Sequence, residues 1–194
     1  MEINHLKELL KEFNSNVNFN QDLKKKNWFN IGGKTKIFFK VDNLKDLTKY
    51  LKVLDKREKI SIIGAGSNTL ISDETYDGIV IKLGKNFNRI SLLGDDIIIS
   101  GTAVLDKNLA DFAAESNLGG FEFLTCIPGT VGGGIKMNAG CFGREIKDIL
   151  ISVQAIDKIG NILTIPSKEI NFDYRSNDLS ENLLFLSASF KGEK

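Results

Sequence analysis

The feature that most restricts the fold of this chain is a glycine-rich stretch in its second half. Eight glycines fall among the 25 residues from Gly119 to Gly143. Apolar side chains stand between them, which is unusual for a solvated loop: Ile127, Val131, Ile135 and Met137. We therefore expect this stretch to be partly buried and to present one face, bare of side chains, to a flat ligand. A glycine-rich surface loop is the alternative interpretation.

Residues 127–143 are expected to bind that ligand mainly through the backbone. Pro128 fixes its own φ, and a short helix that begins near Gly129 to Gly134 would have free N–H groups at its start. Such groups favour an anionic or electron-rich edge of a ligand. Asn138 adds a side-chain donor and acceptor, and the small residues that follow it again permit close approach of the backbone.

A second candidate is the motif GAGSN at residues 64–68. Gly64 and Gly66 allow positive φ, so that consecutive peptide N–H groups can point at one anion. Ser67 and Asn68 add donors, and the pyrophosphate of a dinucleotide is the expected guest. A Rossmann loop is not expected, because it needs a third glycine followed by a long helix. Taken alone, GAGSN is equally well interpreted as an ordinary tight turn.

The rest of the pattern mixes helices, strands and hairpins. Apolar periodicity predicts amphipathic helices over residues 2–14, 44–54 and 105–116. Strands are predicted at 36–41, at 60–63 (short and buried), at 78–83 and at 183–190, and hairpins at 88–100 and 149–165. This order predicts an α+β fold rather than a doubly wound parallel sheet.

Charge and composition argue against several classes of function. Lys and Arg number 26 against 25 Asp and Glu, and this balance gives no support for a nucleic-acid or membrane partner. No run approaches the roughly 20 apolar residues of a membrane span, and no signal-peptide core is present, so a cytoplasmic location is expected. His5 is the only histidine, which disfavours a Ser-His-Asp triad or a His-based metal site. Cys126 and Cys141 lack CxxC spacing and are interpreted as small buried or loop residues rather than metal ligands.

Together, the motifs resemble the UDP-N-acetylenolpyruvoylglucosamine reductase family. They are GAGSN, IPGTVGG, MNAG followed by FG, and FDYRS at 172–176, with IGG at 31–33 opening the first strand. The resemblance runs from about Asn27 to Phe190. It implies a PCMH-type FAD-binding fold, shared with relatives of vanillyl-alcohol oxidase, in which two α+β subdomains hold the flavin between them. The subdomains are expected at about 27–83 and 84–192, after an N-terminal helix and lead-in over residues 1–26.

The resemblance also implies roles for particular residues. The FAD pyrophosphate would be held by Gly64, Ala65, Gly66, Ser67 and Asn68. The flavin and adenosine path would be lined by Pro128, Gly129, Thr130, Gly132, Gly133, Asn138, Ala139 and Gly140. Arg175 would stabilise the charge that builds toward the substrate carboxylate as hydride adds to the enolpyruvyl double bond. An arginine in an ordinary surface salt bridge is the alternative for that position.

Two main hypotheses of function follow. In the first, the chain is an NADPH-dependent flavoprotein with non-covalent FAD that makes UDP-N-acetylmuramate for peptidoglycan synthesis. In the second, it is an FAD-binding remnant without turnover, because the chain stops at Lys194 whereas the family continues into a substrate domain. That domain carries a serine proton donor and a glutamate partner of the arginine. Under the first hypothesis, either a partner chain completes the UDP-sugar site or the chain is an early-terminated version of an active enzyme. Another PCMH-type oxidase is a third reading, although those enzymes usually tether flavin through His or Cys. Smaller departures from the family pattern are Asn27-Trp28, Gly134 in place of Ala, and Cys141-Phe142 in place of Ala-Tyr.

Overall fold

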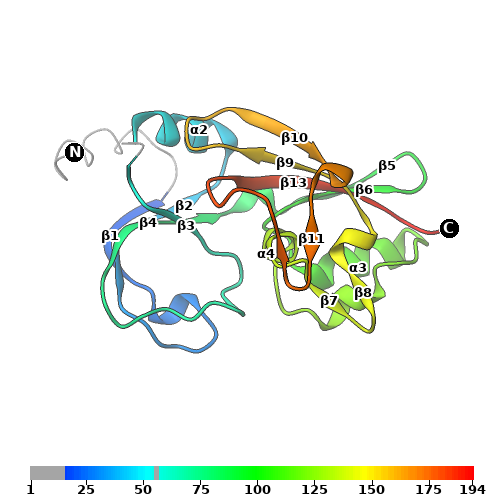
Figure 1. Ribbon diagram of the computed structural model, residues 1–194, viewed down its shortest axis with the longest axis horizontal. Coiled ribbons are helices and arrows are strands. Elements are labelled where there is room, and N and C mark those ends of the chain that lie inside the picture. Colours follow the sequence, from blue (N-terminus) through cyan, green and yellow to red (C-terminus); the bar gives the residue numbers. More distant parts are fainter. Residues whose placement is uncertain (1–15, 55–56) are drawn as a thin grey trace. The chain divides into compact units, whose positions relative to one another are not determined.

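The chain divides into two compact units in a computed structural model, which describes residues 16–54 and 57–194 (Figure 1). Unit 1 reaches to Asn86 and includes Lys158–Asn161, and unit 2 comprises Phe87–Asp157 with Ile162–Lys194. The chain passes from one to the other within the 3-10 helix η2 (Lys85–Phe87). The helix predicted over residues 2–14, with His5, lies outside the described residues. In the described part, no helix is long and apolar enough to cross a membrane.

Unit 1 is built on a four-stranded sheet in the order β1-β2-β4-β3. β1 runs antiparallel to β2, whereas β2, β4 and β3 are parallel. The strands are β1 (Asn16–Asp22), β2 (Lys34–Val41), β3 (Ile60–Ile62) and β4 (Tyr76–Leu83), and the 3-10 helix η1 (Lys24–Lys26) follows β1. The predicted strand at 78–83 is therefore present and starts two residues earlier.

Helix α2 (Leu44–Val53) begins where the sequence predicted it and packs against β2. Asn43 caps the helix, because its side chain accepts a hydrogen bond from the N–H of Asp46 at 2.8 Å. The buried face of the helix meets the sheet through Tyr50, whose ring centroid lies 4.2 Å from that of Phe39. Both aromatic side chains are fully buried, so this contact forms part of the core of unit 1.

The prediction that the strand at 60–63 is buried was wrong for most of its length. β3 is an edge strand that pairs only with β4, and Ser61 and Ile62 are exposed. Only Ile63, just after the strand, enters a hydrophobic cluster, where it joins Leu23, Phe38 and Val80. An apolar run of this length does not reveal whether its second edge is paired.

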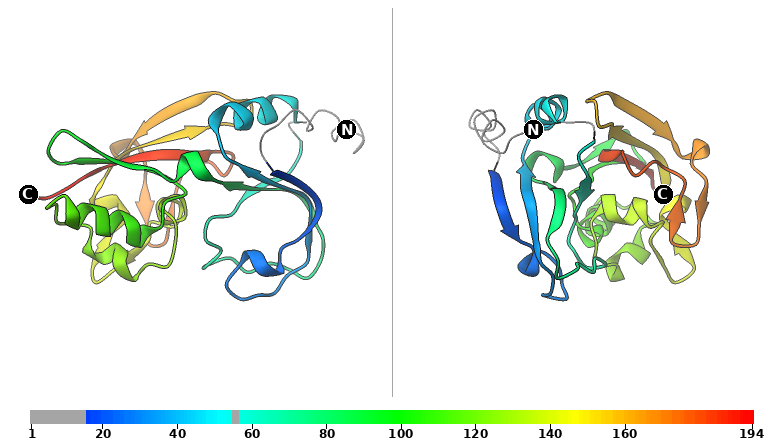
Figure 2. Two further views of the ribbon diagram at one scale, coloured as in Figure 1. Left: turned by 180° about the vertical axis from the view of Figure 1, so that it is seen from behind. Right: turned by 60° about the vertical axis from the view of Figure 1, so that its left-hand side comes forward.

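Unit 2 contains a five-stranded antiparallel sheet in the order β10-β9-β13-β6-β5. Its strands are β5 (Ile90–Leu93), β6 (Ile97–Gly101), β9 (Leu150–Ile156), β10 (Ile162–Pro166) and β13 (Leu184–Lys191). Both predicted hairpins and the predicted last strand are confirmed by this pairing. The helices α3 (Asp106–Glu115) and α4 (Val131–Lys136) lie on one face of the sheet (Figure 2).

Short elements complete unit 2 around α4. They are η3 (Glu122–Cys126), β7 (Gly140–Cys141), β8 (Arg144–Glu145), η4 (Ile146–Asp148), η5 (Ser167–Glu169), β11 (Phe172–Asp173) and β12 (Ser176–Asn177). The glycine-rich stretch is partly buried as expected, because Val131 and Ile135 are fully buried in the core of the unit. On α3, Leu109 and Ala113 are buried and Phe112 is half-buried.

Candidate functional site

The GAGSN segment follows β3 and forms a loop whose backbone donors are free. Within the described residues, none of the N–H groups from Gly64 to Asn68 donates a hydrogen bond. The side chains of Ser67 and Asn68 have no hydrogen-bond partner there either. Gly64 to Ser67 are buried or half-buried, and N–H groups in such positions are normally paired with an acceptor.

Close packing against the chain before β2 holds this loop in place. Gly66 is buried with a φ of +72°, and a Cβ there would stand 2.4 Å from the carbonyl oxygen of Lys26. The Gly66 carbonyl accepts a hydrogen bond from the Trp28 N–H at 3.0 Å. Glycine is therefore required at this position for both its conformation and its lack of a side chain.

The side chain of Asn27 holds the segment before β2 that packs against Gly66. The sequence did not indicate this role. Asn27 is buried, and its Nδ2 donates to the carbonyls of Leu23 (3.1 Å) and Ile31 (2.8 Å). These bonds close the turn that carries Trp28 against Gly66. In the sequence, Asn27 stood out only as the start of the family resemblance and as part of the unusual Asn27-Trp28 pair.

In unit 2, the IPGTVGG segment pairs with the chain that leads into α3. The N–H of Asp106 donates to the Gly129 carbonyl, and the N–H groups of Val131 and Gly132 donate to the carbonyls of Val104 and Thr102. Thr130 is the N-cap residue of α4, whose glycines begin the short helix that the sequence predicted.

This pairing leaves three donors at the start of α4 unused. Within the described residues, the N–H groups of Gly129, Thr130 and Gly133 donate no hydrogen bond. Gly133 is exposed, and a Cβ there would meet only the Oγ1 of Thr130, at 3.6 Å. Gly134 faces the interior instead, where a Cβ would lie 3.1 Å from Asp106 Oδ1. The outer face of the segment is therefore bare, as the sequence predicted.

Asn138 occupies a different position from the one expected for a ligand-lining side chain. It is fully buried, and its Nδ2 donates to Glu145 Oε2 at 3.0 Å and to the Asp173 carbonyl at 3.1 Å. Its Oδ1 accepts from the Lys147 N–H at 3.2 Å. All the polar atoms of its side chain are therefore engaged inside unit 2. Its side chain ties the MNAG segment to β8, η4 and β11 rather than facing a ligand.

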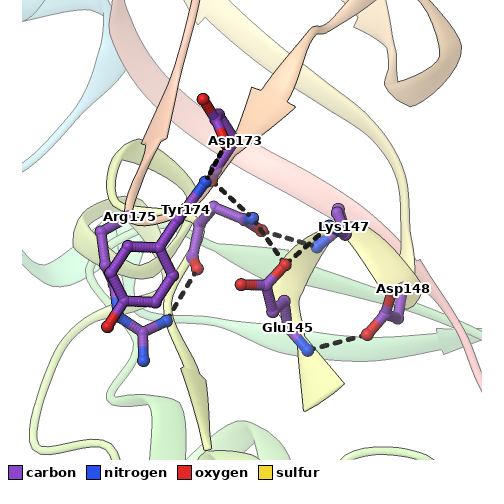
Figure 3. Close-up of polar contacts among 7 residues, drawn as sticks. Glu145, Lys147, Asp148, Asp173, Tyr174 and Arg175 are labelled. Carbon is purple, nitrogen blue, oxygen red and sulfur yellow. Dashed lines mark hydrogen bonds and ion pairs between the residues drawn. The ribbon is translucent and has the colours of Figure 1, made fainter. Parts of the chain in front are cut away.

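Arg175 is brought directly onto this segment. It lies in the turn between β11 and β12 with a φ of +55°, a left-handed conformation that costs a side-chain-bearing residue about 1 kcal/mol. Its Nη1 donates to the Asn138 carbonyl at 3.2 Å and its Nη2 to the Gly140 carbonyl at 2.8 Å. The Tyr174 ring lies beside the guanidinium, 5.1 Å from centroid to Cζ (Figure 3).

The charges around Arg175 form a small network. Glu145 makes an ion pair with Lys147 at 2.7 Å, and Figure 3 shows both near the turn that carries Arg175. The hydrogen bond from Lys147 is the main cause that lowers the pKa of Glu145, with further lowering from Asn138 and from the charge of Arg175. Among the described residues, Arg175 makes no ion pair within 4 Å. Its guanidinium is oriented instead by the two neutral carbonyls of Asn138 and Gly140.

Asp106 is a second residue that the sequence analysis missed. It is fully buried at the start of α3, and neither carboxyl oxygen has a hydrogen-bond partner among the described residues. A Cβ at Gly129 would lie 2.7 Å from its Oδ2, so the carboxyl lies directly behind the glycine-rich segment. Burial raises its pKa from 3.8 to about 7. In the sequence, an Asp just after Leu105 is typical of the first turn of a helix. Its buried position behind the glycine-rich segment could therefore not be predicted.

Comparison with known proteins places the chain in a family. A family described as FAD binding domain matches residues 35–166. The chain belongs to this family. It is 62% identical over all of its 194 residues to the UDP-N-acetylenolpyruvoylglucosamine reductase of Pelagibacter ubique (strain HTCC1062), of which it covers 64%. It is 45% identical over 173 residues, 89% of the chain, to the reductase of Rickettsia canadensis (strain McKiel), of which it covers 58%. The resemblance drawn from the motifs is confirmed.

Solved structures agree with the sequence comparison. The UDP-N-acetylenolpyruvylglucosamine reductase of Thermus caldophilus superposes with a TM-score of 0.79 at 27% identity, over 93% of this chain and 62% of that one. An alkyldihydroxyacetonephosphate synthase shares the fold alone, with a TM-score of 0.67 at 14% identity over 100% of this chain and 40% of that one. The predicted α+β, PCMH-type FAD-binding fold is therefore confirmed. The chain spans somewhat less than two thirds of the length of these reductases.

The raised pKa of Asp106 predicts that the free energy of unfolding depends on pH. The unfolded chain releases this proton near pH 3.8, whereas the folded protein keeps it up to about pH 7. The folded state thus binds more protons between these values, and its free energy of unfolding falls as pH rises through that window. Relative to Asp106→Asn, we expect the wild type to lose on the order of 4 kcal/mol between about pH 4 and pH 8, measured by urea unfolding.

The matched control is Asp111→Asn, which changes an exposed aspartate on the same helix. Its pH profile should follow that of the wild type. Equal profiles for Asp106→Asn and the wild type would show that the Asp106 carboxyl does not titrate in this way.

Proposed function

We propose that this chain binds FAD non-covalently through its two glycine-rich segments. The observation that carries the proposal is a set of N–H groups that donate no hydrogen bond within the described part of the chain, at residues 64–68 and at Gly129, Thr130 and Gly133. Such donors fit the phosphate oxygens and the polar edges of a dinucleotide, and each charge-assisted bond contributes about 1.5–3 kcal/mol. Membership of the FAD binding domain family supports the same cofactor.

We assign to each segment the part of FAD that suits its structure. We assign the pyrophosphate to Gly64, Ala65, Gly66, Ser67 and Asn68, where donors are most concentrated. The flavin and adenosine path is assigned to Pro128, Gly129, Thr130, Gly132 and Gly133 with Asn138, Ala139 and Gly140. Within that set, the buried side chain of Asn138 acts by fixing the backbone of the segment.

We further propose that the chain is the flavin-binding part of a reductase that converts UDP-N-acetylenolpyruvoylglucosamine to UDP-N-acetylmuramate with NADPH, a step of peptidoglycan precursor synthesis. The named reductases among its relatives support this reaction and its UDP-sugar substrate. FAD, when bound, supplies hydride transfer to the enolpyruvyl double bond. The serine proton donor, the glutamate partner of the arginine and the substrate-covering surface are assigned to the part of the reductases that this chain does not span.

Arg175 is the residue of this chain to which we assign the substrate carboxylate. Two neutral carbonyls fix its guanidinium, and its remaining N–H donors and full charge stay available for an anion. A charge held in place before the reaction stabilises developing negative charge without reorganisation in the transition state. Its left-handed backbone is consistent with strain kept at a functional site.

Two adjacent glycines of α4 test the cofactor proposal. Gly133→Leu adds a side chain on the exposed face, where only Thr130 is close, while Gly134→Ala adds a methyl group toward the buried Asp106. Leucine also raises helix propensity, so Gly133→Leu should keep the fold. We expect it to weaken FAD binding about tenfold or more, measured by titration of flavin fluorescence, with one FAD bound per wild-type chain.

Gly134→Ala serves as the inward-facing control, and its FAD affinity should stay near that of the wild type while its stability changes. A wild-type protein that takes up no flavin would refute the cofactor proposal. Equal FAD affinities of Gly133→Leu and the wild type would show that the exposed face of α4 does not bind FAD.

The reaction is tested by turnover with NADPH and the enolpyruvyl UDP-sugar, with UDP-N-acetylmuramate measured by mass spectrometry. Arg175→Lys keeps the charge but loses the planar fork, so we expect kcat to fall about 100-fold with the flavin absorbance intact. A wild-type chain that binds FAD and forms no product is a binding unit alone. NADPH consumed only by oxygen would show working flavin without a substrate site.

A further inference from the structure

Three lysines of unit 1 lie at one corner of its sheet. Lys40 and Lys82 are directly paired in the parallel strands β2 and β4, so their side chains leave the same face of the sheet (Figure 1). Lys26 belongs to η1, and its Nζ lies 5.1 Å from the centroid of the Phe38 ring. Phe38 precedes Lys40 by two residues on β2 and therefore points to that same face. The three lysines are thus neighbours.

The three positive charges have no compensating partner. None of the ammonium groups makes an ion pair or a hydrogen bond with residues 16–54 and 57–194. At the opposite end of the same two strands, Lys36 does have a carboxylate partner, because its Nζ lies 3.3 Å from Asp77 Oδ1. Like charges directly opposite each other on neighbouring strands destabilise a sheet. A bound anion would offset this repulsion.

The surroundings of Lys82 strengthen the demand for an anion. This side chain is half-buried, as is that of Lys26, whereas Lys40 is exposed. Burial lowers the pKa of Lys82, and the charges of Lys26 and Lys40 lower it further. A negative ligand at this corner would act against the effect of the two neighbouring charges.

The GAGSN loop leaves the sheet at this corner. The N–H of Ile63 donates to the Ile81 carbonyl at 3.0 Å, which extends the β3–β4 pairing up to the residue before the motif. Ile63 packs in the same hydrophobic cluster as Phe38. On its other side, the loop rests on the Lys26 carbonyl through Gly66. The N–H groups of the motif, which donate no hydrogen bond among the described residues, therefore lie beside the three lysines.

We propose that Lys26, Lys40 and Lys82 form the cationic wall of a diphosphate site whose other wall is the GAGSN backbone. The N–H groups orient the phosphate oxygens, and the ammonium groups add full charges, which amide dipoles lack. Lysine binds phosphate as a point charge on a flexible stem, so three lysines can adapt to both phosphates. The assignment of the diphosphate to FAD rests on the proposed function, whereas the binding of a diphosphate as such does not.

The deciding experiment titrates inorganic pyrophosphate and ADP into the full chain by calorimetry, with adenosine as the uncharged counterpart. Lys82→Met keeps the length of the side chain and removes its charge. We expect this variant to bind pyrophosphate and ADP about tenfold more weakly than the wild type, or weaker still, with no change for adenosine. Added salt should weaken the binding of pyrophosphate to the wild type more than to the variant.

Stability without ligand separates this role from a structural one. Removal of one of three repelling charges should raise the urea midpoint of Lys82→Met while its affinity for pyrophosphate falls. A lysine that only supported the fold would lower both. Lys40→Met, at the exposed member of the cluster, repeats the test without disturbing a half-buried side chain.

Lys36→Met is the matched control, because it makes the same change on β2 at a lysine that already has a carboxylate partner. Its affinity for pyrophosphate should equal that of the wild type. Equal affinities of the wild type, Lys82→Met and Lys40→Met would overturn the proposal. So would a wild type that binds no pyrophosphate at concentrations on the order of 1 mM.

Pyrophosphate contains no flavin, so the two proposals fail separately. A wild type that binds FAD with an affinity independent of these lysines refutes only the cationic wall. A wild type that binds pyrophosphate through the lysines and takes up no FAD refutes only the flavin proposal, and leaves a diphosphate site for another nucleotide.

Discussion

The account of this protein depends on backbone N–H groups in two glycine-rich segments that have no partner among residues 16–54 and 57–194. A folded chain normally pairs such groups within helices and sheets, because an unpaired buried donor costs free energy. Among the described residues, Gly64 to Asn68 and three residues at the start of α4 have backbone N–H groups that donate no hydrogen bond. The surrounding fold holds these bends rigidly, so the donors are oriented before any ligand arrives. Preorganised donors bind an anion without a further ordering cost.

Buried side chains maintain each bend from behind. In unit 1, Asn27 closes the turn on which Gly66 rests. In unit 2, the Asn138 side chain joins the MNAG segment to β8, η4 and β11. Arg175 donates to the carbonyls of Asn138 and Gly140 in the same segment. The Asp106 carboxyl lies behind Gly129 and has no hydrogen-bond partner among the described residues, and burying such a group costs free energy. Asn27 and Asn138 therefore fix the geometry of the two segments, while the backbone N–H groups and the side chains of Ser67 and Asn68 are the unpaired donors of the described residues.

Much of this arrangement could be predicted because it depends on residues that are close together in the sequence. Strand-like runs at 88–100 and 149–165 gave the two hairpins of unit 2, and apolar periodicity over residues 44–54 gave the start of α2. The glycines with interleaved Val131 and Ile135 indicated a partly buried segment with one bare face. The FAD-binding fold was implied by the resemblance of these motifs to the reductase family.

The remainder depends on contacts that are distant in sequence. The edge position of β3 is fixed by which strands pair, and β1 was missed because its buried partner strand lies about 20 residues further on. The engagement of Asn138 requires β8 and β11 to converge on it, which its own neighbours do not indicate. The isolation of the Asp106 carboxyl likewise appears only once Gly129 and Gly134 are packed over it.

Amide hydrogen exchange with and without FAD tests the central claim most directly, since it reports on the individual donors. The account predicts that FAD slows deuterium uptake at residues 64–68 and 129–133, with little change in the β5–β6 hairpin. Saturation with FAD that leaves exchange at both segments unchanged would contradict the claim that these donors hold the cofactor.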